Sequence, residues 1–175
     1  MKTVTDWVKQ LRAIKLAEAP DYLDENSGLP GAHANLTLVE AVVRVADDLL
    51  VNELINHGGE YQMMCAAAFF GAHADNPDFK AAARRLASDD RWRVREGVAM
   101  GLQWLGDVSL LNLSRVIAEW FESGDLLVQR AAIAAMCEPR LLRTPEYAKL
   151  AIDACNKATQ NLAKLSAEKG KAPAA

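Results

Sequence analysis

The chain has 175 residues, of which 51% are hydrophobic and 25% charged, with a formal net charge of −3. This length favours a single domain with a hydrophobic core, and no stretch approaches the ~20 uninterrupted apolar residues of a membrane span. The acidic balance argues against a protein coated in nucleic acid, although it leaves room for a local basic patch.

The N-terminal residues and the cysteines point to the cytoplasm. Residues 1–7 lack the apolar segment and the small-residue cleavage site of a signal peptide. The cysteines are odd in number and lie within helical apolar patterns, so we expect buried free thiols in a reducing compartment. They are Cys65, Cys137 and Cys155.

Residues 1–59 are predicted to form an N-terminal helical cap. Apolar residues recur at helical spacing over 4–18, and this helix is expected to end at Ala19-Pro20. An irregular segment over 21–35 follows, in which Leu29-Pro30-Gly31-Ala32 is typical of a type II turn. A loop this long is either functional or a strap that covers the open end of a helical stack.

Three further helices are predicted before residue 90. An amphipathic helix over 36–57 stops at Gly58-Gly59. Residues 60–73 are apolar nearly all round, which indicates an inner helix, and Asp75-Asn76-Pro77 starts a helix that ends near Ser88. Sulfur and aromatic side chains at helical spacing in the inner helix are typical of a core; they are Met63, Met64, Phe69 and Phe70.

The most informative feature of the chain is a short sequence segment that nearly repeats after 35 positions. Its first copy runs over 90–100 and its second over 125–135. A period in the thirties with helical apolar spacing is the signature of stacked helix pairs. With a shift of 31, Tyr61 falls on Trp92, which extends the pattern toward the N-terminus. The aligned residues of the two copies are Asp90 with Asp125, Arg95 with Arg130, and Val98 with Ile133.

Residues 60–165 are therefore predicted to hold about three helix pairs, and 166–175 a flexible tail. No segment alternates as a strand would. Gly97 and Gly101 lie on one helix face and permit close helix contact, at a cost of ~1 kcal/mol each relative to alanine. The helices of this region are expected over 92–105, 108–122, 126–137 and 145–164.

The segment Asp90-x-Trp92-x-Val94-Arg95-Glu96-Gly97-Val98-Ala99-Met100-x-Leu102-x-x-Leu105-Gly106-Asp107 resembles a HEAT-type repeat, and 125–137 resembles it less fully. The resemblance implies an all-α, armadillo-like fold: a right-handed α-α superhelix of about three helix pairs with an N-terminal cap. The whole chain is similar to small stand-alone bacterial HEAT-like proteins of unassigned role. An aspartate–arginine ladder along the stack is also implied, with Asp90, Arg95, Asp125 and Arg130 at the matching positions.

One candidate site combines Trp92, Glu96 and Arg130. Trp92 and Glu96 share a helix face at i and i+4, and Arg130 stands at the equivalent turn of the next repeat. This set is similar to the active surface of the HEAT-like DNA alkylation repair glycosylases, which join a Trp-x-x-x-Asp helix to an arginine of the following repeat. An aromatic ring and a carboxylate stabilise a cationic base, and arginine holds a phosphate. The alternative is that Trp92 packs between repeats and Arg130 belongs to the ladder.

A second candidate is a cationic patch at the turn near residue 90. Its predicted binding residues are Arg84, Arg85, Arg91 and Arg93. A basic patch beside an aromatic ring suits nucleic acid. The alternative is a solvated turn in which these arginines, with Arg95, pair with Asp89, Asp90 and Glu96. The histidines show no ligand spacing, so neither a metal nor a cofactor is expected.

The leading functional hypothesis is a non-catalytic α-solenoid that binds another macromolecule, most simply a protein, because solenoids present extended concave surfaces. The alternative is a nucleic-acid-binding protein related to the alkylation repair glycosylases. Assembly of the chain into a homo-oligomer is a third possibility.

Overall fold

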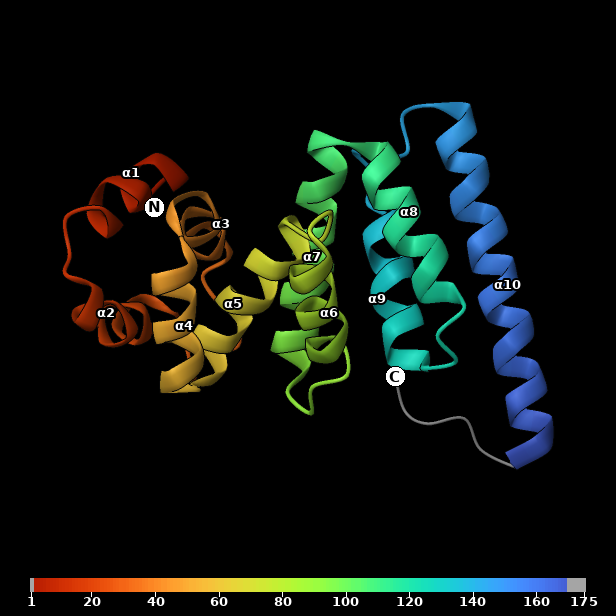
Figure 1. Cartoon of the computed structure of the whole chain (residues 1–175), viewed down its shortest axis with the longest axis horizontal. Helices are drawn as coiled ribbons and strands as arrows, with labels where there is room; N and C mark the ends of the chain where they lie inside the picture. The colour runs from red at the N-terminus through yellow and green to blue at the C-terminus, as the bar shows by residue number, and fades with distance from the viewer. Residues whose placement is uncertain (1, 170–175) are drawn as a thin grey trace.

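The computed structural model describes residues 2–169, which form ten α-helices, one short 3₁₀ helix and no strand. The helices follow one another along the long axis of the molecule, with α1 near one end and α10 at the other (Figure 1). The all-α prediction is therefore confirmed. Within the described residues, no helix is both long and apolar enough to cross a membrane.

The N-terminal helix is shorter than its apolar pattern predicts. Helix α1 spans Val4–Leu11, and a capping box between Thr3 and Asp6 caps its N-terminus. The 3₁₀ helix Leu16–Glu18 leads directly into α2, Ala19–Asn26. The expectation that Ala19-Pro20 ends a helix is wrong, because a proline in the first turn lacks only an N–H that would have no helical acceptor.

The irregular segment predicted over 21–35 is correspondingly reduced to 27–35, since its first part belongs to α2. Its turn is closed by the Gly31 N–H, which donates to the Gly28 carbonyl at 2.9 Å, with the cis bond Leu29–Pro30 between them. The turn therefore begins one residue earlier than the predicted type II turn. We call residues 27–35 the strap.

The helix predicted over 36–57 is two helices, α3 (Leu36–Val45) and α4 (Asp48–His57). Ala46 is extended, and the Asp47 carboxylate accepts the Leu50 N–H at 2.9 Å as an N-cap. Aspartate competes for backbone N–H groups and so favours a helix start over a helix interior. The predicted glycine stop is confirmed, because Gly58 closes α4 in the left-handed conformation.

The remaining helices lie close to the segments predicted as helical. Helix α5 contacts α6, α7 contacts α8 and α9 contacts α10, while α7 also packs between α5 and α9. Residues 166–169, expected in the tail, continue the last helix, and 170–175 lie outside the described residues. The bounds are α5 Glu60–Ala72, α6 Pro77–Leu86, α7 Trp92–Val108, α8 Leu110–Phe121, α9 Leu126–Met136 and α10 Pro145–Lys169.

Glycines let α5 and α7 touch through their backbones, as the sequence predicts for Gly97 and Gly101. A Cβ on Gly97 would press on the Met64 carbonyl, and one on Gly101 would press on the Ala68 carbonyl. Gly71 of α5 faces the Val98 carbonyl in the same way. The contact therefore fixes α7, and the residues at its start, relative to α5.

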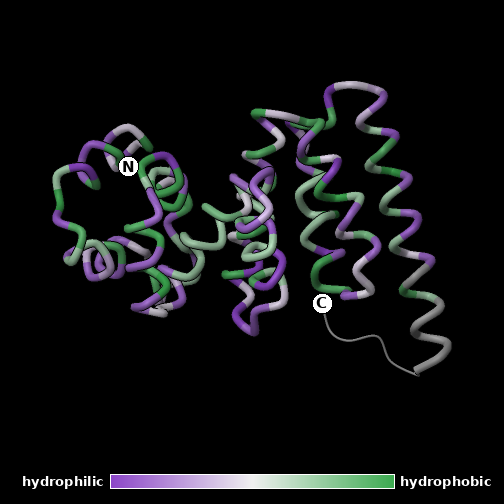
Figure 2. Tube along the Cα trace, in the orientation of Figure 1, coloured by the Kyte–Doolittle hydropathy of each residue, from purple (hydrophilic) through white to green (hydrophobic). Residues whose placement is uncertain are grey.

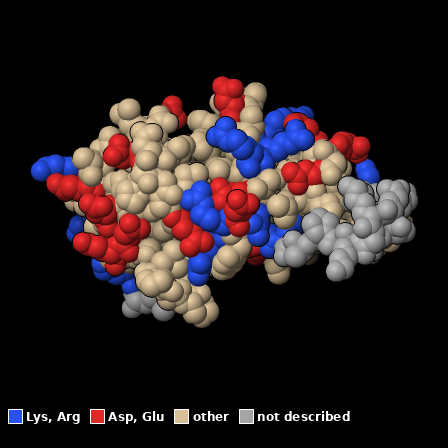
Figure 3. Space-filling view, turned by 90° about the horizontal axis from the view of Figure 1, so that it is seen from below, with Lys and Arg blue, Asp and Glu red and all other residues tan. Residues whose placement is uncertain are grey.

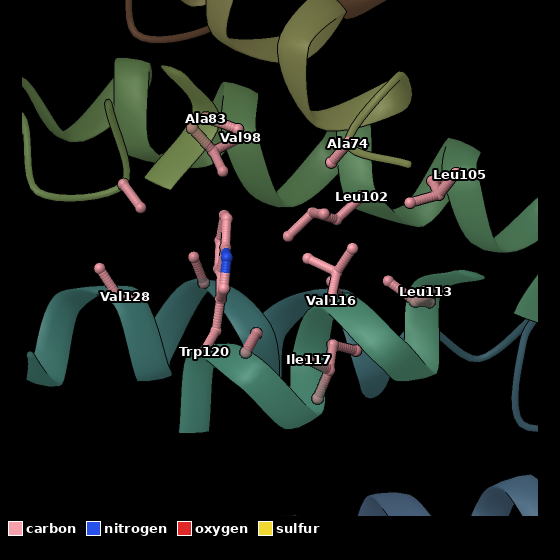
Figure 4. Close-up of a cluster of buried hydrophobic side chains, with 14 of the residues drawn as sticks. Ala74, Ala83, Val98, Leu102, Leu105, Leu113, Val116, Ile117, Trp120 and Val128 are labelled. Carbon is pink, nitrogen blue, oxygen red and sulfur yellow. The ribbon is translucent and has the colours of Figure 1, made fainter. Parts of the chain in front are cut away.

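Two apolar clusters meet at α5, which is buried along most of its length. The core predicted from the sulfur and aromatic stripe is confirmed: Met64, Phe69 and Phe70 are buried, and Met63 is partly buried against them. In the same cluster as Phe69 and Phe70, the fully buried Trp120 of α8 points toward α6 and α7 (Figure 4). Helix α10 instead alternates between apolar and polar residues along its length (Figure 2).

The cysteines do not share one environment. Cys65 is a fully buried free thiol, as predicted. Cys137 is exposed and Cys155 half-buried, which corrects the prediction for both. Cys137 stands at the C-terminal cap of α9, directly after the buried Met136.

Candidate functional site

Trp92 is the first residue of α7, and its side chain is 53% exposed. The Arg93 guanidinium carbon lies 4.8 Å from the centroid of the indole ring, a cation–π contact. Because no helical turn precedes Trp92, neighbouring side chains do not cover the rest of the ring. A large aromatic group therefore stands in solvent at the junction of cap and stack.

A slot of about 230 Å³ opens beside this ring. One wall comes from α7, the other from the strap and the start of α3, and Met64 of α5 also lines the slot. The aromatic, thioether, carboxylate and imidazole groups that meet there come from α7, α5 and the strap. The lining residues are Ala32, His33, Ala34, Leu36, Met64, Trp92, Arg93, Glu96 and Met100.

The strap reaches this position because it is tied to α5. The Tyr61 hydroxyl donates to the Asn35 carbonyl at 2.6 Å, and the Asn35 N–H donates to the Ser27 carbonyl at 2.7 Å. The next residue of α5, the buried Gln62, donates from its side chain to the Pro20 carbonyl of α2 at 2.8 Å. Sequence reasoning missed the strap wall, because only these long-range contacts place it opposite α7.

Glu96 and Arg130 are brought together as the sequence suggests. The Arg130 guanidinium donates to the Glu96 carboxylate at 2.5 Å and so links α9 to α7. Trp92 lies one turn before Glu96, and both line the slot, whereas Arg130 lies behind the carboxylate and is not among the lining residues. The site is therefore an exposed ring beside a carboxylate that already has a cationic partner.

The predicted aspartate–arginine ladder is replaced by other pairs. Arg95 donates to the backbone carbonyls of Asp89 and Asp90, not to an aspartate side chain. Asp125 instead caps α9 and accepts a hydrogen bond from Ser88. Several ion pairs join side chains 33 to 35 positions apart in sequence, among them Glu60–Arg93, Glu96–Arg130 and Asp107–Arg140.

The arginines of the predicted cationic patch separate into two groups. Arg91 pairs with Asp89 and also donates to the Gly58 carbonyl at 2.8 Å, while Arg93 pairs with Glu60 at 3.4 Å. The Arg91 hydrogen bond lowers the pKa of the Asp89 carboxyl. These two side chains therefore face the N-terminal part of the stack.

Arg84 and Arg85 belong to the last turn of α6 and line a different hollow, of about 610 Å³, between α6, α8 and the start of α9. Acidic groups share this hollow, since Glu119 pairs with Lys80 and Asp125 accepts from Ser88. Figure 3 shows basic and acidic side chains interleaved over the middle of the face it presents. A binding role for the four arginines stays a prediction.

The described residues contain no group of three or more histidine, cysteine, aspartate or glutamate side chains placed to hold a metal ion. Comparison with models of protein families, with curated proteins and with solved structures finds no match to this chain.

Proposed function

We propose that this chain is a non-catalytic, HEAT-like α-solenoid that binds another protein through the slot beside Trp92. The solenoid part of the proposal is supported by three consecutive helix pairs, α5–α6, α7–α8 and α9–α10. It is also supported by the ion pairs that recur about one repeat apart. Such stacks bind partners along extended surfaces without requiring a deep pocket.

The observation that carries the binding proposal is the exposed indole of Trp92 over a slot that Met64 and Met100 line. Tryptophan is enriched among the residues that dominate protein interfaces, and methionine adapts to varied partners. The slot, at about 230 Å³, is smaller than the ~300–1,000 Å³ of small-molecule sites. It therefore suits one inserted side chain of a partner.

Capture of partners from the native cytosol tests this proposal. Immobilised wild-type protein is compared with Trp92→Ala and with Leu111→Ala, which removes an apolar side chain of similar exposure on α8, away from the slot. We expect Trp92→Ala to lose a protein that wild type and Leu111→Ala both retain. Equal capture by all three forms would contradict the proposed site.

A second candidate function, nucleic-acid binding, is favoured by one arrangement: an exposed tryptophan next to a carboxylate that an arginine of the following repeat contacts. Binding of a labelled duplex is measured at about 50 and 200 mM salt, because phosphate contacts weaken steeply with salt. Arg84→Ala combined with Arg85→Ala should weaken that binding. Excision of an alkylated base that disappears in Glu96→Gln would establish the enzymatic form of this alternative.

A further inference from the structure

Two cysteines from different helices meet at the C-terminal end of the stack. Cys137 caps α9, and Cys155 lies within α10. Their Sγ atoms are 3.4 Å apart, although 18 positions separate the residues in sequence. The two sulfurs are therefore in contact as thiols, and a small further approach would bring them to bonding distance.

Both sulfurs are open to reagents that cannot reach the third cysteine. Cys137 is exposed and Cys155 half-buried, whereas Cys65 is fully buried. Partial burial of the sulfur, together with the neighbouring Cys155 thiol, raises the pKa of Cys137 to about 11. Thiolate is the reactive form, so we expect attack by Cys137 to be slow at neutral pH and faster as pH rises.

We propose that Cys137 and Cys155 form a site of reversible disulfide modification whose reactant is a small-molecule disulfide such as oxidised glutathione. One cysteine thiolate attacks a sulfur of the reactant, which forms a mixed disulfide and releases one thiolate. The second cysteine then attacks the protein sulfur of that mixed disulfide and releases the other thiolate. Two protons leave the cysteines, and two electrons reduce the reactant to two thiols.

The bond would fasten the last helix to the stack. Helix α10 packs on the core chiefly through Tyr147, Ala151 and Ala158, while Leu150 and Ile152 are exposed. Small alanine contacts bury little apolar area, so α10 depends on few contacts for its position. A covalent link between α9 and the middle of α10 therefore restrains a helix that is otherwise lightly held.

The test uses the full chain equilibrated in glutathione buffers of increasing oxidised fraction. We expect the thiols counted after denaturation to fall from three to one and the intact mass to drop by two hydrogens. Peptide mapping should join Cys137 to Cys155 and leave Cys65 free. Addition of dithiothreitol should restore all three thiols, and hydrogen exchange in α10, but not in α5, should slow on oxidation.

Single variants separate this pair chemistry from ordinary surface oxidation. Cys137→Ser and Cys155→Ser each lack the second thiol, so each should accumulate one glutathione adduct where wild type accumulates none. Three thiols that persist in wild type under oxidising buffer would overturn the proposal. So would stable glutathione adducts on wild type, or a disulfide that forms between two chains instead of within one.

Discussion

Replacement of Gly101 by alanine tests whether the backbone contact between α5 and α7 holds the stack together. The added Cβ would meet the Ala68 carbonyl oxygen, the Ala72 amide nitrogen and the Gly71 Cα. All three are backbone atoms, so no side-chain rotation relieves the clash. The two helices must separate along a buried interface.

Two opposing effects set the magnitude. Alanine gains about 0.8–1.0 kcal/mol of helix propensity over glycine, whereas overpacking a well-packed site costs about 1–3 kcal/mol and sometimes more. Because backbone must move, we expect the packing cost to dominate, with a net loss of about 2 kcal/mol in the free energy of unfolding. For a chain of this size that loss lowers Tm by roughly 4–8 °C.

Gly106→Ala is the matched control in the same helix. Gly106 is also buried, but a Cβ there would meet only the terminal carbons of the Leu113 and Leu141 side chains, which can rotate. We expect its stability to stay within about 1 kcal/mol of wild type. Urea unfolding followed by circular dichroism measures both variants. A Gly101→Ala protein as stable as wild type would refute the close contact.

Three further predictions concern the core and the charges. Trp120 is fully buried, so Trp120→Ala should lower the free energy of unfolding by about 3–5 kcal/mol in urea titrations. A double-mutant cycle on Glu96 and Arg130, whose side chains are 30% and 38% exposed, should give a coupling of at most about 1 kcal/mol. Arg91 lowers the pKa of the Asp89 carboxyl. Their pairing therefore stabilises the fold at pH values above the unfolded-state pKa of this carboxyl, and this stabilisation is lost as pH falls through the folded-state pKa. Acid titrations of stability should show this loss in wild type and not in Asp89→Asn.

The sequence predicts the stacked part of the chain better than the cap, for a physical reason. From Glu60 onward, the helices have a clear start or stop and either an apolar stripe or, in α5, an apolar surface nearly all round, so local pattern and tertiary packing agree. In the cap, Pro20 can be interpreted locally as a helix stop or as a first-turn residue. Asp47 can be interpreted as a residue inside a helix or as an N-cap. Only the packing of the finished cap selects the second interpretation.

The candidate site could be predicted only in part. The i, i+4 spacing of Trp92 and Glu96, with the repeat offset to Arg130, places these residues near one another, and the structure joins Glu96 to Arg130. His33 and the strap wall carry no pattern that indicates their position. They face α7 because of hydrogen bonds between residues far apart in sequence, and a single sequence does not record such contacts.

The residues at the starts of α5, α7 and α9 explain why the slot forms at α7. Tyr61 of α5 is buried, and its hydroxyl holds the strap at Asn35, whereas Leu127 of α9 is half-buried. Trp92, the first residue of α7, remains exposed beside the strap. The strap therefore covers one aromatic position and forms a wall beside the next.

Tyr61→Phe tests this arrangement, because it keeps the ring and removes only the hydrogen bond to the Asn35 carbonyl. Loss of one such bond costs about 1 kcal/mol, so we expect the fold to persist while hydrogen exchange over 27–35 becomes faster. Capture of the partner should weaken, since one wall of the slot becomes mobile. Tyr147→Phe is the control, because the Tyr147 hydroxyl is buried without a hydrogen-bond partner and lies on α10. Unchanged exchange over 27–35 in Tyr61→Phe would show that other contacts hold the strap.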